Sequence, residues 1–146
     1  MDKQTIALLG GRGMLGTELA AAFRRQGFEV RVHDLPEFDL GNIEHLRQAV
    51  DGADAVVNCA AFTDVDGAES KAQIAHRVNA EAVGNLGRIA SERGKWVLHF
   101  STDFVFDGRL DRPYVETDAP NPLSEYGRSK LAGERLLQDR GCDGCI

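Results

Sequence analysis

A tyrosine and a lysine four residues apart have the types and spacing needed for proton transfer. They lie in the run Tyr126-Gly-Arg-Ser-Lys130, within a stretch that predicts a helix over 124–138. Residues four apart share one helical face, so we expect the phenol and the ammonium to point into the same space. A nearby cation stabilises the phenolate form. The pair can therefore give a proton to a carbonyl oxygen that receives hydride, although an ordinary surface pair has the same spacing.

Hydroxyl side chains follow the fourth predicted strand, which covers residues 96–100. Ser101 and Thr102 precede Asp103 at the carboxyl end of that strand. Ligands of open parallel sheets bind at this edge, and a hydroxyl there can stabilise a developing alkoxide. A turn or capping role is the alternative for both hydroxyls.

A glycine-rich run separates the first predicted strand from the first predicted helix. It reads Gly10-Gly-Arg-Gly13-Met-Leu-Gly16 and fits G-x-G-x-x-G from Gly11, as well as a longer spacing from Gly10. Such glycines permit a tight turn, a close approach to a pyrophosphate and close packing of helix and strand. The amide groups at the helix start then face the phosphates. The run predicts a dinucleotide site, with a purely structural turn as the alternative.

Asp34 closes the second predicted strand, about twenty residues beyond the glycines, where a carboxylate binds the adenosine ribose hydroxyls. This position favours NAD over NADP, because a carboxylate repels a 2′-phosphate. Arg12 in the glycine run could nevertheless tolerate that phosphate, so both cofactors stay open. A solvated loop acid is the alternative reading of Asp34.

Strands and helices alternate along the chain, which predicts an α/β fold with a doubly wound parallel sheet of the Rossmann-like, NAD(P)-binding kind. We expect one domain over 1–146. The predicted strands cover 5–9, 28–33, 55–58 and 96–100, the helices cover 14–26, 43–50, 71–92 and 124–138, and 142–146 begins a further strand.

Composition excludes several classes of protein. The chain has 146 residues and a formal net charge of −6, which argues against nucleic acid as a partner. No apolar run is long enough for a membrane span, and the start shows no signal peptide. The three cysteines (Cys59, Cys142 and Cys145) are too few for a disulfide framework, which favours the cytoplasm. Cys142 and Cys145 have no second ligand pair and the histidines have no ligand spacing, so no metal site is predicted.

Several longer segments resemble one family closely. The chain is similar to the dTDP-4-dehydrorhamnose reductase family of extended short-chain dehydrogenase/reductases. The resemblance is carried by the glycine run and by the segments 57–63, 65–70, 78–86, 101–108, 113–116 and 121–134, which include Ser-Thr-Asp-Phe-Val-Phe at 101–106 and Tyr-x-x-x-Lys at 126–130.

The resemblance implies a reaction and the residues that perform it. The reaction is the reduction of the C4 keto group of dTDP-4-dehydro-L-rhamnose to dTDP-L-rhamnose by NADH or NADPH. Tyr126 is then the acid and Lys130 its partner, and both also contact the cofactor, where the lysine can hold the nicotinamide ribose. Thr102 polarises the ketone, and Asp103 lies beside the sugar-nucleotide substrate.

The resemblance also implies where the nicotinamide cofactor lies. Its phosphates would contact Gly13, Met14 and Leu15. Its adenosine would be surrounded by Asp34, Asp39 and Leu40. The wall of its cleft would be formed by Ala61, Phe62 and Thr63. Glu18 matches a glutamate that some members use for magnesium at a homodimer contact. Its usual partners are absent, so magnesium is not predicted and the homodimer stays open.

Two departures from the family pattern matter. Phe104 stands where the family commonly has tyrosine, and the resemblance covers only about the first half of the family's chain. We therefore expect a fragment that lacks the substrate-binding region and is unstable or inactive alone. Two alternatives remain, namely another sugar-nucleotide 4-ketoreductase or epimerase, and a non-catalytic regulatory subunit.

Overall fold

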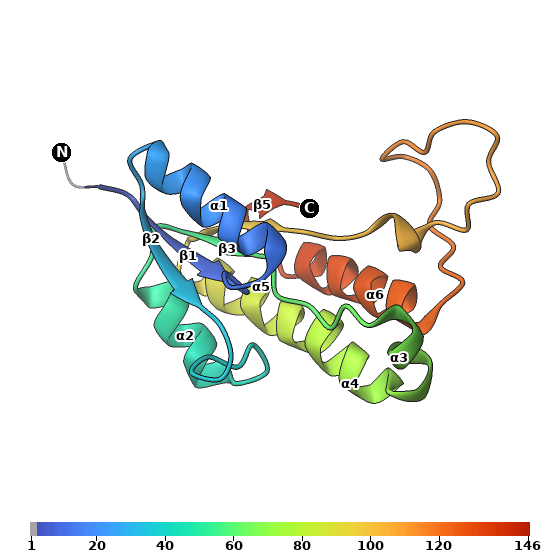
Figure 1. Ribbon diagram of the computed structural model, residues 1–146, viewed down its shortest axis with the longest axis horizontal. Coiled ribbons are helices and arrows are strands. Elements are labelled where there is room, and N and C mark those ends of the chain that lie inside the picture. The colour runs from blue at the N-terminus through green and yellow to red at the C-terminus, as the bar shows by residue number, and fades with distance from the viewer. Residues whose placement is uncertain (1–2) are drawn as a thin grey trace.

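The protein is built on a five-stranded parallel sheet with the strand order β2-β1-β3-β4-β5 (Figure 1). The computed structural model describes residues 3–146, and Met1 and Asp2 of the predicted domain lie outside the described residues. The α/β, doubly wound prediction is confirmed. The strands are β1 (Thr5–Leu9), β2 (Glu29–His33), β3 (Ala55–Asn58), β4 (Trp96–His99) and β5 (Gly144–Cys145).

The central strands are apolar because both of their faces are covered. Leu8 and Leu9 in β1 are completely buried although they point to opposite faces of the sheet. β1 pairs with β2 on one side and with β3 on the other. β5 pairs in parallel with β4, which confirms the further strand expected near the end of the sequence.

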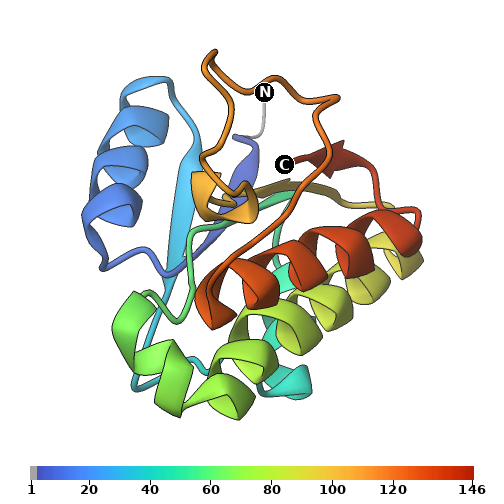
Figure 2. The ribbon, with the colours of Figure 1, turned by 90° about the vertical axis from the view of Figure 1, so that its right-hand side faces the viewer.

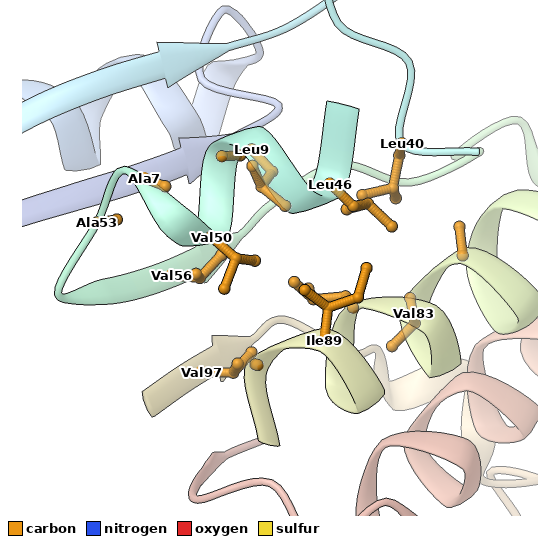
Figure 3. Packing of buried hydrophobic residues seen from close by; sticks show 14 of the residues in the cluster. Ala7, Leu9, Leu40, Leu46, Val50, Ala53, Val56, Val83, Ile89 and Val97 are labelled. Carbon is orange, nitrogen blue, oxygen red and sulfur yellow. The ribbon is translucent and has the colours of Figure 1, made fainter. Parts of the chain in front are cut away.

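Helices cover the two faces of the sheet unequally (Figure 2). Helix α1 (Met14–Arg25) packs on one face, where Ala20 meets Leu8 and Val57. The other face carries the larger core, formed with α2 (Ile43–Asp51), α5 (Ala82–Glu92) and α6 (Glu125–Asp139). Figure 3 shows Val50 and Ile89 of this core between the helices and the sheet.

The helix predicted over 71–92 is observed from residue 72, but it contains a π-helical turn that the sequence did not predict. It consists of α4 (Ala72–His76), the π-helical turn η1 (Arg77–Glu81) and α5, which follow one another without a gap. Lys71, with φ −125° and ψ 37°, separates α4 from the short preceding helix α3 (Val65–Ser70). The apolar spacing of the segment cannot reveal a turn widened by one residue, because the same face stays buried on either side of it.

The last helix is positioned by a side-chain cap and lies close to its neighbour. The Ser124 hydroxyl accepts a hydrogen bond from the Gly127 amide at 3.0 Å, which starts α6 at Glu125. A Cβ atom at Gly133 would lie 2.0 Å from the Asn79 carbonyl oxygen, so glycine lets α6 approach η1.

Within residues 3–146, no helix is long and apolar enough to cross a membrane.

Candidate active site

A cleft of about 630 Å³ runs along the carboxyl ends of the strands, between the glycine turn and α6. It brings together most residues that the sequence assigned to the cofactor. Those that line it are Gly10, Gly13, Met14, Leu15, Gly16, Asp34, Asp39, Leu40, Ala61, Thr63, Tyr126 and Lys130. Phe62 is not among them, because its side chain packs against Ala68, Ala75 and Tyr126.

The glycine turn has the close backbone contacts that a pyrophosphate cradle requires. Gly10 has φ +73°, and a Cβ atom there would lie 2.6 Å from the Ala60 amide nitrogen. A Cβ atom at Gly16 would lie 2.3 Å from the Gly10 carbonyl oxygen. Helix α1 begins behind this turn with no side-chain cap and no acid in its first turn. Its first amides are therefore available to an anion, so the turn fits a dinucleotide pyrophosphate.

Asp34 is held in place at the end of β2. Its Oδ2 accepts a hydrogen bond from the Arg12 amide and its Oδ1 accepts one from the Leu35 amide, both at 2.8 Å. The Arg12 guanidinium donates to Glu37 Oε2 at 2.7 Å and to the Leu35 carbonyl at 2.8 Å. The end of the cleft at Asp34 thus has a fixed carboxylate rather than a freely solvated acid.

Lys130 is a buried lysine, only 2% exposed. Its Nζ donates to the Phe100 carbonyl at 2.6 Å, at the end of β4. Burial lowers the pKa of Lys130 to about 8, although the charges of Glu134 and Cys59 act in the opposite direction. Burial of Lys130 therefore rules out an ordinary surface pair with Tyr126, and the two side chains line the same cleft.

A second polar contact joins α6 to the same corner of β4. The Ser101 hydroxyl donates to Glu134 Oε1, one helical turn beyond Lys130. Ser101 lines the cleft as well. Lys130 and Glu134 therefore bind Phe100 and Ser101 from one face of α6. These two bonds fix the position of α6 relative to the end of β4.

Thr102 caps the short 3₁₀ turn η2 (Asp103–Val105). Its Oγ1 accepts a hydrogen bond from the Phe104 amide at 3.2 Å and donates to Asp103 Oδ1 at 3.3 Å. Neither Thr102 nor Asp103 lines the cleft. The Phe104 ring meets the Tyr126 ring edge-on at 5.6 Å, which places this turn beside the phenol. The capping role is observed, and the polarising role of Thr102 and the substrate contact of Asp103 stay predictions.

Asn79 is a buried positioning residue that sequence reasoning missed. It lies in the π-helical turn, and its side chain accepts from the Phe62 amide at 2.8 Å and donates to the Phe62 carbonyl at 3.0 Å. The same amide group donates to Ser129 Oγ at 2.9 Å, and Ser129 donates to the Tyr126 carbonyl at 2.7 Å. Asn79 thus connects the loop after β3 to the helix that carries Tyr126. Its only signal in the sequence is a polar residue on an otherwise apolar helical face.

His99 is unsuited to act as a base. It is 1% exposed, and its Nδ1 lies 3.1 Å from Asn58 Nδ2. Burial and the neighbouring charge of Lys130 lower the pKa of His99 to about 3, so the ring is neutral. Its Nε2 is buried with no hydrogen-bond partner among the described residues. Only one of its two ring nitrogens therefore has a polar partner.

The remaining metal and thiol candidates do not converge. Glu18 is exposed on α1. In the part of the chain that the structure describes, no group of three or more His, Cys, Asp or Glu side chains is placed to hold a metal ion. Cys142 is half-buried against the core and Cys145 is exposed.

Several known proteins are similar in sequence to this chain. Residues 4–146 match the model of the RmlD substrate binding domain family. The dTDP-4-dehydrorhamnose reductase of Escherichia coli is 43% identical over 92% of this chain and 46% of its own length. The probable low-salt glycan biosynthesis reductase Agl14 of Haloferax volcanii is 39% identical over 94% of this chain and 50% of its own length.

A solved structure supports the fold directly. The crystal structure of dTDP-4-dehydrorhamnose reductase from Bacillus anthracis in complex with NADP superposes with a TM-score of 0.90 at 30% identity, over 95% of this chain and 50% of that one. The chain thus spans about half the length of the relatives it matches.

Proposed function

Because the chain belongs to the RmlD substrate binding domain family, we propose that it forms the cofactor-binding and proton-donating part of a dTDP-4-dehydrorhamnose reductase. The observation that carries the proposal is the single cleft that contains the glycine turn, Asp34, Tyr126 and Lys130. A regulatory subunit without catalysis would not need a buried lysine beside a tyrosine at the mouth of that cleft.

Each of these residues has a separate role in the reduction of the C4 ketone. A bound reduced nicotinamide supplies the hydride to the C4 carbon. Tyr126 gives its phenolic proton to the C4 oxygen, so the ketone becomes a hydroxyl group and the tyrosine becomes a phenolate. The Lys130 ammonium, fixed by the Phe100 carbonyl, stabilises that phenolate until solvent returns a proton. In this scheme Thr102 donates to the same oxygen once its hydroxyl proton is released from Asp103 Oδ1.

The adenosine end of the cleft supports NADH as the preferred cofactor. Asp34 presents a carboxylate whose two oxygens are already oriented by backbone amides. Such a carboxylate accepts hydrogen bonds from ribose hydroxyls and repels a 2′-phosphate. The half of the cleft near Met14 and Leu15 would cover the pyrophosphate.

We also propose a sugar nucleotide as substrate and the cytoplasm as location. Cys59, Cys142 and Cys145 are all free thiols, which suits a reducing compartment. The formal net charge of −6 supports a partner other than nucleic acid.

The test is a cofactor titration of this chain together with its Tyr126→Phe variant. We expect saturable NADH binding, followed by cofactor fluorescence, with dissociation constants that agree within about threefold between the two proteins. In a full-length reductase the same substitution should lower the oxidation of NADH by dTDP-4-dehydro-L-rhamnose by roughly 10²–10⁴-fold, because the general acid is lost. Absence of saturable binding refutes the proposed site, and turnover that survives the substitution refutes Tyr126 as the acid.

A further inference from the structure

We propose that Glu37 sets the cofactor preference of this site by holding the Arg12 guanidinium away from a ribose 2′-phosphate. This inference rests on the proposed function, because it concerns the adenosine end of the same cleft. It names Glu37 as a specificity-determining residue that acts through Arg12, without contact to NADH.

Arg12 is the residue of the glycine turn that can reach a 2′-phosphate, and its contacts show where it points. Its Nη1 donates both to Glu37 Oε2 at 2.7 Å and to the Leu35 carbonyl at 2.8 Å. Its own backbone amide donates to Asp34. The guanidinium is therefore directed toward the segment after β2, where Glu37 and Leu35 accept from its Nη1.

A hollow of about 200 Å³ adjoins the cofactor cleft at this corner. It shares Arg12, Asp34 and Phe38 with the cleft, and Glu37 lines the hollow but not the cleft. Among the described residues that line the hollow, Arg12 is the only arginine or lysine. Its other titratable side chains are two acids and two histidines, namely Asp34, Glu37, His33 and His45.

The histidines do not supply a second positive charge here. Burial and the charge of Arg31 lower the pKa of His33, which keeps that ring neutral at neutral pH. His45 accepts a hydrogen bond at Nδ1 from the Asp39 amide at 2.9 Å, and a neutral ring can make this contact. The corner therefore holds two carboxylates against one guanidinium, a net negative charge.

The two cofactors meet this corner differently. A ribose 2′-hydroxyl donates to the Asp34 carboxylate and needs no cation. A 2′-phosphate brings nearly two negative charges and must compete with Glu37 for Arg12. The side chains of Arg12 and Glu37 are 58% and 68% exposed, so their ion pair is partly screened. We therefore expect a graded preference for NADH rather than complete exclusion of NADPH.

The experiment measures NADH and NADPH affinities for the chain, for Glu37→Gln and for Glu37→Asp. Removing the Glu37 charge should tighten NADPH binding by roughly tenfold, because one charge is withdrawn from a dianion and Arg12 is released. NADH binding should change by less than about threefold. Glu37→Asp keeps the charge and should keep the original ratio of affinities.

Two further variants separate the specific effect from a general one. Glu29 makes a comparably exposed ion pair with Arg31 at 2.9 Å, at the far end of β2. Glu29→Gln should therefore leave the ratio unchanged. Adding Arg12→Met to Glu37→Gln should abolish the gain in NADPH binding, because the released guanidinium is then absent.

The outcomes are distinct. An unchanged ratio of NADPH to NADH affinity in Glu37→Gln overturns the inference. A gain in NADPH binding that persists after Arg12→Met overturns it as well, and so does an unmodified chain that binds NADPH more tightly than NADH. If the unmodified chain binds neither cofactor, it is the proposed function that fails.

Discussion

Burial of the Lys130 ammonium should make the stability of this protein rise with pH relative to a Lys130→Met variant. The pKa of Lys130 falls from 10.5 to about 8 in the folded protein, mainly because the side chain is removed from water. The unfolded chain therefore binds a proton that the folded chain has released over the window between these two values. In that window the free energy of unfolding increases with pH.

The size of the effect follows from the pKa shift. Below pH 8 both states carry the proton, and the folded state bears the full cost of burial, about 3 kcal/mol. Integration from pH 7 to pH 9.5 relieves about 2 kcal/mol of that cost. Methionine has no titrating group, so the variant lacks this gain, although it also loses the hydrogen bond to the Phe100 carbonyl. The loss of this hydrogen bond changes the difference in free energy of unfolding between the two proteins at pH 7. It does not change how that difference varies with pH.

Urea unfolding of both proteins across this pH range measures the difference directly. We expect the wild-type chain to gain about 2 kcal/mol on the variant between pH 7 and pH 9.5. Lys71→Met, at an exposed position, is the matched control and should follow the wild-type pH dependence. Parallel curves for the wild type and Lys130→Met, within about 0.5 kcal/mol, would show that the Lys130 ammonium is not desolvated.

Two other substitutions test the cradle and the link between the cleft walls. Gly16→Ala should lower stability by about 1–3 kcal/mol in thermal unfolding, because its Cβ would lie 2.3 Å from the Gly10 carbonyl oxygen. Gly13→Ala, whose Cβ would lie 3.4 Å from the same oxygen, should have little effect on stability, and equal losses would contradict the steric argument. Asn79→Leu should cost about 3 kcal/mol in urea unfolding, because it leaves the half-buried Phe62 amide and carbonyl and the buried Ser129 hydroxyl without their Asn79 partner. A loss below about 1 kcal/mol would mean that these groups find water instead.

The sequence predicted the sheet and most of the cleft because both depend on short-range patterns. Apolar runs with glycine behind them mark buried parallel strands, and the carboxyl ends of such strands meet at one edge. Asp34, Ser101 and the glycine run could therefore be assigned to one cleft without coordinates. The strand and helix limits differ from those predicted by only one or two residues where the chain has a cap, as at Ser124.

Features that depend on contacts distant in sequence could not be predicted in this way. The π-helical turn shows no break in apolar spacing, and the role of Asn79 depends on Phe62 and Ser129, 17 and 50 residues away. Nothing local distinguishes a buried lysine from an exposed one at position 130. The ion pair between Arg12 and Glu37 likewise requires two loops to meet.

The bonds made by Lys130, Glu134 and Asn79 have a consequence for motion. They tie the helix that carries Tyr126 to the residues that follow β3 and β4, so we expect the α6 side of the cleft to move as one body. We then expect the opposite wall of the cleft, formed by the glycine turn, to adapt to an incoming dinucleotide. Met14 in this wall is 94% exposed. Backbone relaxation measurements should accordingly find nanosecond mobility concentrated in the turn before α1 and little in α6, so that the proposed proton donor would be a stationary reference point for the nicotinamide.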